Sequence, residues 1–335
     1  MNVLSCFDGM SCTQIALRQL GYENINYYAS EVDKYATKVT QANYPKTHQV
    51  GDITKIDPEK LPKIDLMVGG SPCQDLSFAG KGKGLIEGER SSLFFAFVDL
   101  LKAIKPKYFL VENVRMKKEY QDIISDILGV QPIKINSSLV SAQNRVRLYW
   151  TNIPNIKQPR DRGIILSDIL EEEVDSKYDA GKHLLAGYRG GDQLNPNYKS
   201  QANTIHRDKV ATLSAGTHGY ANGYVKGRHT YRKLTPREAE RLQTVPNNYT
   251  AHVSNTQRYK MLGNGFTVEV IKHILSNMKE KKKVTIESFG DLIELATDEG
   301  WVDNYDDEWN CSIAEAMEED ATDFLESKGY IISYE

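Results

Sequence analysis

The sequence has little cysteine and no long apolar run. Its 335 residues include four cysteines, at positions 6, 12, 73 and 311, and no two of them form a C-x-x-C pair. This spacing favours neither a disulfide framework nor a zinc site, and it fits a reducing compartment. No stretch of 18 apolar residues is present, and the opening residues MNVL begin a strand rather than a signal peptide. We therefore expect a soluble cytoplasmic protein with neither a membrane partner nor a metal.

Basic residues are scarce at the C-terminal end. Residues 284–335 contain sixteen acidic residues and one lysine, a balance of −15. Subtracting these from the chain totals of 42 Lys or Arg and 45 Asp or Glu leaves 41 basic and 29 acidic residues in 1–283, a balance of +12. A basic body is typical of a protein that binds a polyanion, although it also fits mere solubility. The acidic tail could compete for that anion or dock a partner, or it could be a solubilising appendage.

Residues 69–80, GGSPCQDLSFAG, follow the apolar segment IDLMV. The apolar segment predicts a buried strand of a parallel sheet, which places Cys73 at the carboxyl edge where open α/β sheets bind ligands. The next residues, 75–90, are rich in glycine and carry Lys81 and Lys83, as expected for a mobile cationic loop. Cys73 is therefore a candidate nucleophile, and the alternative is a small buried thiol.

Polar residues also follow three short strands before residue 55. The first strand, 2–7, leads through Asp8 and Gly9 into a helix, the second, 26–30, ends at Glu31, and Gly51-Asp52 marks a third edge. An acidic residue after the second strand binds ribose hydroxyls in such folds, although it could simply favour a helix N-terminus. The pattern predicts a cofactor with an adenosine part, either a dinucleotide or S-adenosylmethionine.

The strand expected over 108–114, YFLVENV, carries Glu112 near its C-terminal end. A buried carboxylate is costly unless it has a partner or is protonated. The segment QNRVR places Arg145 and Arg147 on one face of an extended chain, where two guanidiniums would repel without an acidic partner. Glu112 is the candidate partner, and the alternative is that Glu112 caps the next helix.

The remaining pattern predicts helices and a loop-rich region. Helices are expected over 13–21, 33–43, 91–104, 118–128 and 267–277, with another that is capped at Thr235, and strands over 132–139 and 146–151. Residues 154–230 accumulate Gly, Asn, Tyr and His, which suits a recognition surface, although an irregular insertion is the alternative. The charge run 279–283 predicts a linker to a small acidic module with helices and a final strand.

These motifs, in this order, resemble those of the cytosine-5 DNA methyltransferases of bacterial or phage type, over residues 3–278. FDG is similar to the family's cofactor turn, SPCQ to its nucleophile loop, ENV to its acid strand, QNRVR to its arginine pair, RKLTPREAERLQ to its helix beside the recognition region, and GNG to its closing cofactor segment. Residues 69–154 are also similar to the animal de novo DNA methyltransferases. The sequence departs from the family pattern at Ser11 and Cys12, where most members have glycine, and at Phe266, where a small aliphatic residue is common.

The resemblance implies an α/β fold. This is the Rossmann-like S-adenosylmethionine-dependent methyltransferase fold, with a mixed, mostly parallel sheet, helices on both faces and a smaller irregular target-recognition domain. We expect the catalytic and cofactor-binding domain over 1–154, the recognition domain over 155–255, a segment returning to the first domain over 256–280, and the basic linker and acidic C-terminal module over 281–335.

The resemblance also implies a role for individual residues. Cys73 would add to carbon 6 of cytosine, Glu112 would hold or protonate ring nitrogen 3, and Arg147 would hold Glu112 and the base oxygen, with Arg145 in support. S-adenosylmethionine would contact Phe7, Gly9, Glu31, Val32, Asp52, Ile53, Pro72, Leu93, Asn264 and Phe266. Double-stranded DNA would contact Gln74, Ser77, Lys81, Lys83, Arg90, Thr212, Leu213 and Arg237.

The implied activity is methyl transfer to carbon 5 of a cytosine that is flipped out of the duplex. We expect a monomer in the cytoplasm of a bacterium or a phage-infected host, acting either as a solitary protective enzyme or in a restriction–modification pair that shares only its target with an endonuclease. Three alternatives remain open. A nicotinamide oxidoreductase would explain the strand ends but not PCQ, ENV and the arginine pair together; the others are a non-catalytic DNA-binding relative and an RNA methyltransferase of the same family.

Overall fold

The computed structural model describes residues 1–70, 91–180, 203–204, 209–213, 215, 223–226, 230–278, 282–301, 311–328 and 330–334. The chain forms two compact units, one of residues 1–153 with 157–272 and the other of residues 154–156 with 273–335. Helix α10 (Val268–Leu275) is divided between them. Because the described residues omit 71–90, the predictions for Pro72, Cys73, Gln74, Ser77, Lys81, Lys83 and Arg90 lie outside them.

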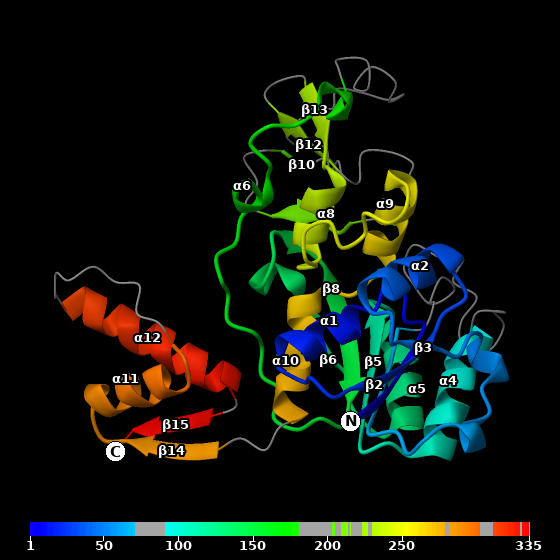
Figure 1. Cartoon of the computed structure of the whole chain (residues 1–335), viewed down its shortest axis with the longest axis horizontal. Coiled ribbons are helices and arrows are strands. Elements are labelled where there is room, and N and C mark those ends of the chain that lie inside the picture. Colours follow the sequence, from blue (N-terminus) through cyan, green and yellow to red (C-terminus); the bar gives the residue numbers. More distant parts are fainter. Residues whose placement is uncertain are drawn as a thin grey trace. The chain divides into compact units, whose positions relative to one another are not determined.

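A seven-stranded sheet forms the centre of the larger unit (Figure 1). Its strand order is β3-β2-β1-β4-β5-β8-β6, with β1 at Asn2–Cys6, β2 at Asn26–Ser30, β3 at His48–Gln49, β4 at Leu66–Gly69, β5 at Tyr108–Val114, β6 at Ile133–Asn136 and β8 at Val146–Thr151. Strands β1 to β5 are parallel to their neighbours among themselves, whereas β8 is antiparallel to both β5 and β6. The mixed, mostly parallel sheet is therefore confirmed, and its order reverses between β1 and β4, where such sheets bind ligands.

Helices lie on both faces of this sheet, with α1 (Cys12–Gln19) and α2 (Lys34–Asn43) on one side and α4 (Ser91–Ile104) and α5 (Lys118–Leu128) on the other (Figure 1). Side chains alternate along a strand, so each strand contributes to two cores. Leu4 of β1 and Met67 of β4 pack with Phe94 and Phe97 of α4 in a buried cluster. Two short 3-10 helices, η1 (Ile53–Lys55) and η2 (Pro58–Lys60), connect β3 to β4.

Most boundaries predicted in this unit are confirmed, including those of β2, β5, α5 and β8. The strand predicted over 132–139 is too long, because β6 ends at Asn136. The Asn136 side-chain oxygen accepts hydrogen bonds from Ser138 N at 3.1 Å and Arg145 N at 2.9 Å. This cap turns the chain into the 3-10 helix η3 (Ser137–Leu139).

The closing segment also differs from the prediction. Helix α9 (Asn255–Asn264), which the sequence pattern did not indicate, contains Gly263 and Asn264 in its last turn. Gly265 caps α9, and α10 begins only at Val268. A Cβ atom on Gly265 would lie 2.9 Å from Met10 Cε and 3.1 Å from the Met261 carbonyl, so the close approach of this turn requires glycine.

The region expected to be irregular contains a small sheet of short strands. Its order is β10-β12-β13-β9, with β9 at Asp179–Ala180, β10 at Asn203–Thr204, β12 at Gly223–Lys226 and β13 at Thr230–Lys233. Strand β11 (Val210–Ala211) instead pairs with β7 (Gln143–Asn144). Helix α6 (Leu166–Ile169) and the 3-10 helix η4 (Ser176–Tyr178) precede this sheet, and α8 (Pro236–Leu242) follows it.

The smaller unit contains the acidic C-terminal residues. Strands β14 (Lys282–Ile286) and β15 (Tyr330–Tyr334) are parallel and are joined through α11 (Phe289–Asp298) and α12 (Cys311–Lys328). Its core contains Ile286, Leu292, Ala296, Ala321 and Leu325. The predicted helices and final strand are confirmed, but the predicted linker 279–283 is only partly one, because its last two residues belong to β14. The 3-10 helix η6 (Ser276–Met278) follows α10.

In the described part of the chain no helix is long and apolar enough to cross a bilayer.

Candidate active site

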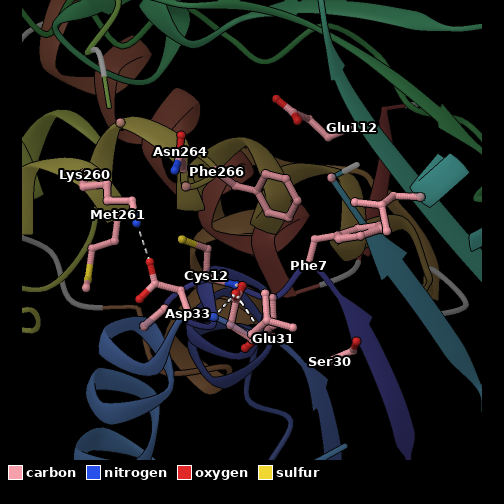
Figure 2. A pocket seen from close by; sticks show the side chains of 18 of the residues that line it. Phe7, Cys12, Ser30, Glu31, Asp33, Glu112, Lys260, Met261, Asn264 and Phe266 are labelled. Atoms are coloured by element: carbon pink, nitrogen blue, oxygen red, sulfur yellow. Dashed lines mark hydrogen bonds and ion pairs between the residues drawn. The ribbon is translucent and has the colours of Figure 1, made fainter. Parts of the chain in front are cut away.

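A cavity of about 570 Å³ opens at the carboxyl edge of the seven-stranded sheet. Its size lies in the range of small-molecule sites, roughly 300–1,000 Å³. The predicted site residues that line it are Phe7, Gly9, Glu31, Val32, Asp52, Ile53, Leu93, Glu112, Arg145, Arg147, Asn264 and Phe266. The ends of β1, β2, β4 and β5, the turn after β3 and the segment after α9 thus meet at one place, although Phe7 and Phe266 lie at opposite ends of the larger unit's sequence (Figure 2).

The turn after β1 has an unusual backbone. Phe7 has a φ of 57° and Gly9 a φ of 60°, and a bulky residue in the left-handed region is rare outside functional or strained sites. Gly9 N donates a hydrogen bond of 2.7 Å to Glu31 Oε2. The turn is therefore held directly against the carboxylate that follows β2.

Glu31 is held at both of its oxygen atoms. While Oε2 accepts from Gly9, Oε1 accepts hydrogen bonds from Val32 N at 2.8 Å and Asp33 N at 2.7 Å (Figure 2). Val32, the next residue, is 77% exposed, which is high for a large apolar residue. A fixed carboxylate thus lies next to an uncovered apolar surface.

The residues of this half of the cavity fit S-adenosylmethionine. Val32 and the buried Ile53 offer apolar surface for an adenine ring, and Glu31 keeps acceptor capacity for ribose hydroxyls. Asp52, whose Oδ1 accepts from Thr54 N at 3.0 Å and so caps η1, provides a carboxylate at the third strand edge. These residues could hold the adenosyl part, while Leu93 and Asn264 line the cavity elsewhere.

Glu112 and Arg147 form a nearly buried ion pair. Arg147 Nε lies 2.8 Å from Glu112 Oε1, and the two side chains are only 13% and 12% exposed. The partner expected for Glu112 is therefore present, and it comes from the antiparallel strand β8, where Arg147 lies opposite Val114. Such a pair keeps the carboxylate in place without a helix-capping role, and the other carboxylate oxygen can face a ligand.

Gly70 and Phe266 form the wall next to Glu112. A Cβ atom on Gly70 would lie 2.7 Å from Phe266 Cε1 and 3.4 Å from Glu112 Oε2. Gly70 must therefore lack a side chain for the Phe266 ring and the carboxylate to meet as they do. The aromatic ring at a position where the family commonly has a small aliphatic residue is accommodated against this bare backbone.

Arg145 does not share the partner of Arg147. It is 3% exposed, and its guanidinium donates to the carbonyl oxygens of Gly265 at 2.9 Å, Gly263 at 3.1 Å and Leu213 at 3.4 Å. Burial and the neighbouring charge of Arg147 lower the pKa of Arg145 to about 10, so it stays protonated near neutral pH. We expected both arginines on one face of a strand, but Arg145 lies between β7 and β8, where the chain passes from one sheet to the other. It holds backbone rather than Glu112.

The cavity is also lined by residues that the sequence analysis did not name individually as site residues, although Asp8, Gly263 and Gly265 belong to its FDG and GNG motifs. They are Asp8, Cys12, Ser30, Asp33, Ala36, Gly70, Asn113, Val114, Gln257, Lys260, Met261, Gly263 and Gly265. Lys260 Nζ lies 2.7 Å from Asp33 Oδ2 and joins α9 to the start of α2 (Figure 2). If the sequence pattern had indicated α9, Lys260 could have been identified as a site residue, because that helix ends in the GNG segment. Burial raises the pKa of the Cys12 thiol to about 12, which makes it an unreactive wall of the cavity.

The described residues expected to contact DNA have protein partners. Thr212 Oγ1 donates to the Asn144 carbonyl, Leu213 is buried at 3% exposure, and Leu213 N donates to Gln143 Oε1 at 3.3 Å. Arg237 Nη1 lies 2.7 Å from Glu171 Oε1, with 43% of its side chain exposed. Their contacts with DNA stay predictions.

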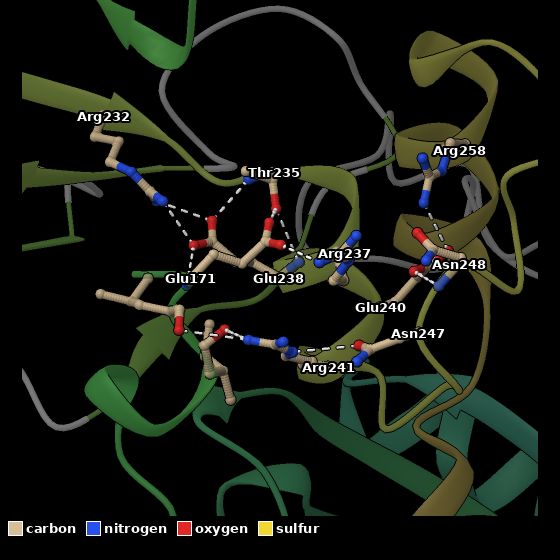
Figure 3. Close-up of polar contacts among 12 residues, drawn as sticks. Glu171, Arg232, Thr235, Arg237, Glu238, Glu240, Arg241, Asn247, Asn248 and Arg258 are labelled. Atoms are coloured by element: carbon tan, nitrogen blue, oxygen red, sulfur yellow. Dashed lines mark hydrogen bonds and ion pairs between the residues drawn. The ribbon is translucent and has the colours of Figure 1, made fainter. Parts of the chain in front are cut away.

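Helix α8 is surrounded by buried ion pairs (Figure 3). It begins at the predicted cap, where Thr235 and Glu238 form a capping box. Glu238 accepts from Arg232 through two hydrogen bonds of 2.8 and 2.7 Å, and Glu240 accepts from Arg258 of α9 at 2.9 Å. Both carboxylates are fully buried, and their ion pairs join α8 to β13 through Arg232 and to α9 through Arg258.

No group of three or more His, Cys, Asp or Glu side chains in the described ranges is placed to hold a metal ion. The candidate site consists of two parts that lie in one cavity. One part is a carboxylate and apolar surface suited to an adenosine, and the other is an acid–arginine pair beside Gly70, which precedes Cys73 by three residues in the sequence.

Comparison with known proteins shows the family to which the chain is related. The family model for C-5 cytosine-specific DNA methylase matches residues 1–280. The chain is 33% identical over 306 residues to the Type II methyltransferase M1.ScrFI of Lactococcus lactis subsp. cremoris, covering 83% of this chain and 78% of that protein. It is 30% identical over 301 residues to the Type II methyltransferase M.NlaX of Neisseria lactamica, covering 83% and 96%.

A solved structure shares the fold. A mutant of the Spodoptera frugiperda DNMT2 superimposes with a TM-score of 0.65 at 20% identity, over 83% of this chain and 99% of that one. The sheet order and helix placement of the larger unit are therefore those of a known methyltransferase fold. Because the family model matches most of this chain, the chain belongs to the C-5 cytosine-specific DNA methylases and is a DNA (cytosine-5) methyltransferase.

Proposed function

We propose that the protein methylates carbon 5 of a flipped-out cytosine within a specific duplex DNA sequence, using S-adenosylmethionine and a transient covalent bond from Cys73. The observation that carries the proposal is the meeting of Glu31 and the Glu112–Arg147 pair in one cavity. Gly70 lines the same cavity and precedes Cys73 by three residues. The Cys73 thiol would therefore be in reach of a base that lies against Glu112.

The residue types supply what the cytosine ring needs. Carbon 5 is a poor nucleophile until a thiolate adds to carbon 6, which forms the S–C6 bond and moves the electrons of the 5,6 double bond toward carbon 5. Glu112, held by Arg147, would bind ring nitrogen 3 and supply its proton as the charge develops. A free thiol has a pKa of roughly 8.5, so Cys73 must be captured as a minority thiolate or activated by its surroundings.

When bound, S-adenosylmethionine supplies an electrophilic methyl group on a positively charged sulfur. Glu31, Val32, Asp52 and Ile53 would hold its adenosine part and so orient it toward Glu112. After carbon 5 has gained the methyl group, loss of its proton to a base re-forms the double bond, and the S–C6 bond breaks to release the Cys73 thiolate. The exclusion of water would depend on the loop after Cys73 closing over the base.

The target must leave the duplex before any of this chemistry can occur, at an unstacking cost of a few kcal/mol. We propose that the recognition residues 155–255 select the surrounding bases and that Lys81, Lys83, Arg90 and Arg237 contact the DNA backbone. The relatives named as Type II methyltransferases support a role in a restriction–modification pair. A solitary protective enzyme in a bacterial cytoplasm is the alternative.

The covalent step has a direct test. A duplex with fluorine in place of hydrogen on carbon 5 of the target cytosine cannot lose a proton there, so the adduct should persist and survive denaturing electrophoresis. We expect the wild-type protein with S-adenosylmethionine to form this complex and Cys73→Ala to form none. Cys311→Ala is the matched control, because that cysteine lies in the smaller unit, and it should form the complex as the wild type does.

The target sequence comes from a second measurement. Base-resolution methylation sequencing of DNA from a host that expresses the protein should reveal one recurrent sequence with 5-methylcytosine, absent with Cys73→Ala. Methylation of that host's RNA with unmodified DNA would contradict the proposal, as would a denaturation-stable complex formed by the Cys73→Ala variant.

A further inference from the structure

Ser11 has a backbone conformation that normally requires glycine. It lies immediately before α1 with a φ of 63° and a ψ of 43°, in the left-handed region. An L-residue is strained there because its Cβ approaches the following carbonyl oxygen. The residue is fully buried, so it cannot relax toward solvent. Something in the surroundings must hold Ser11 in this conformation.

The Asp8 carboxyl provides that hold. Ser11 Oγ donates a short hydrogen bond to Asp8 Oδ2, and Ser11 N donates to the Asp8 carbonyl at 3.1 Å. The other carboxyl oxygen, Oδ1, accepts from Tyr27 Oη of β2 at 2.7 Å, and Ser11 Oγ lies 3.0 Å from Thr40 Oγ1 of α2. Asp8 therefore closes the turn between β1 and α1 through its side chain and its backbone together.

This turn contains the backbone group that orients Glu31. Gly9 lies between Asp8 and Ser11, has a φ of 60° and donates from N to Glu31 Oε2 at 2.7 Å. Asp8 also lines the cavity, although only 8% of it is exposed. If the turn were to relax at Ser11, the direction of the Gly9 N–H would change, and Glu31 would lose one of its three backbone donors.

We propose that Asp8 is a positioning residue for the cofactor, which acts by holding Ser11 in a glycine-like conformation so that Gly9 presents Glu31 to the ribose. The inference rests on the proposed function, because it assumes that Glu31 binds the cofactor. It assigns Asp8 no contact with the reacting atoms. It also explains how the chain keeps a working cofactor turn with serine at position 11.

The test is the affinity for S-adenosylhomocysteine, measured by calorimetry on the full-length protein. Asp8→Ala should bind it about 10- to 100-fold more weakly, as expected when a hydrogen bond to a charged group is lost from an ordered site. Glycine adopts the left-handed region without strain, so the double variant D8A/S11G should recover most of that loss. Asp65→Asn is the matched control, since Asp65 Oδ2 accepts from Asn2 N at 2.8 Å outside the cavity, and it should bind as the wild type does.

The outcomes are distinguishable. Unchanged affinity in Asp8→Ala overturns the proposal, and so does a loss that S11G fails to rescue, because Asp8 would then act only through packing. If Asp8→Ala does not fold, Asp8→Leu with and without S11G answers the same question, since leucine has a side chain of similar length and branching but cannot accept a hydrogen bond from Ser11 Oγ. Glu31→Ala serves as the positive control. Unchanged affinity there would remove the proposed cofactor site, and the role of Asp8 with it, whereas failure at Asp8 alone leaves the proposed function intact.

Discussion

Two buried acidic residues of this protein have different surroundings, and the difference bears on their chemistry. Glu112 meets a guanidinium at 2.8 Å, whereas Asp8, among the described residues, accepts from neutral hydroxyl groups and has Glu31 nearby. Burial, followed in a smaller measure by the charge of Glu31, raises the pKa of Asp8 from 3.8 to about 6 despite those hydrogen bonds. A carboxyl of this kind makes the stability of the fold depend on pH.

We predict that Asp8 lowers stability as pH rises through the range from about 4 to 6. Below pH 3.8 the carboxyl is protonated in both the folded and the unfolded chain; between 3.8 and 6 it is ionised only in the unfolded chain, which favours unfolding. The loss should reach at most about 3 kcal/mol and stay constant above pH 6. Urea unfolding of the wild type and Asp8→Asn at pH 4 and pH 7 measures it. A free-energy difference between the two proteins that is the same at both pH values would contradict this prediction.

At the scale of elements, the cavity depends on how α9 and the segment after it are held. Two backbone carbonyl oxygens around Asn264 accept hydrogen bonds from the Arg145 guanidinium. Gln243 Nε2 donates to the Leu262 carbonyl at 2.6 Å. The Leu213 carbonyl near β11 also accepts from Arg145. One buried guanidinium thus connects the strand junction, the recognition region and the closing cofactor segment.

We expect Arg145→Lys to lower the free energy of unfolding by about 1–3 kcal/mol, because an ammonium cannot reach all three carbonyls and leaves buried acceptors unpaired. Urea unfolding is the measurement. Arg18→Lys is the matched control, since Arg18 also donates to two backbone carbonyls, of Tyr22 and Glu23, but at the exposed surface. The control should change stability by less than about 0.5 kcal/mol. Equal effects of the two substitutions would show that burial of the Arg145 guanidinium contributes little.

At the scale of the whole molecule, the charge is unevenly distributed between the parts of the chain. Residues 284–335 carry −15, while the preceding residues carry +12. The family match ends at residue 280, and the acidic residues form a unit with its own hydrophobic core. The acidic unit is thus an addition to the residues that the family model matches, and the competitor hypothesis predicts that its negative charge opposes the approach of DNA.

We predict that deletion of 282–335 raises the affinity for non-specific duplex DNA at low salt, and that the gain shrinks as salt screens the charges. The deletion should begin at Lys282 because β14 begins there. A control that keeps the unit is the neutralisation of three exposed carboxylates by Glu287→Gln, Glu294→Gln and Asp298→Asn, which should produce a smaller gain of the same sign. Fluorescence anisotropy with labelled DNA at two salt concentrations measures both. Unchanged affinity after the deletion would show that the acidic unit does not affect DNA binding.

Much of this architecture follows from local sequence. Apolar runs that end in Glu31, Gly70 and Glu112 predict parallel strands with polar carboxyl ends, and the structure brings all three into one cavity. The Thr235 cap is equally local, since a threonine followed by proline and then Glu238 needs no distant partner. Helix α9 was missed because its apolar positions are few and it packs through buried polar contacts such as Arg258 with Glu240.

The sequence by itself determined the family, the strand ends that carry the cofactor and acid residues, and the pairing of an arginine with Glu112, because these depend on residue type and order along the chain. The resemblance also implied that Arg147 makes that pair, and only the tertiary structure decided what Arg145 does instead. Arg147 reaches Glu112 from the antiparallel strand β8, while Arg145, two residues earlier, is buried among carbonyl oxygens. It likewise decided that Ser11 holds a glycine's conformation through Asp8, because a strained backbone persists only where packed neighbours prevent its relaxation.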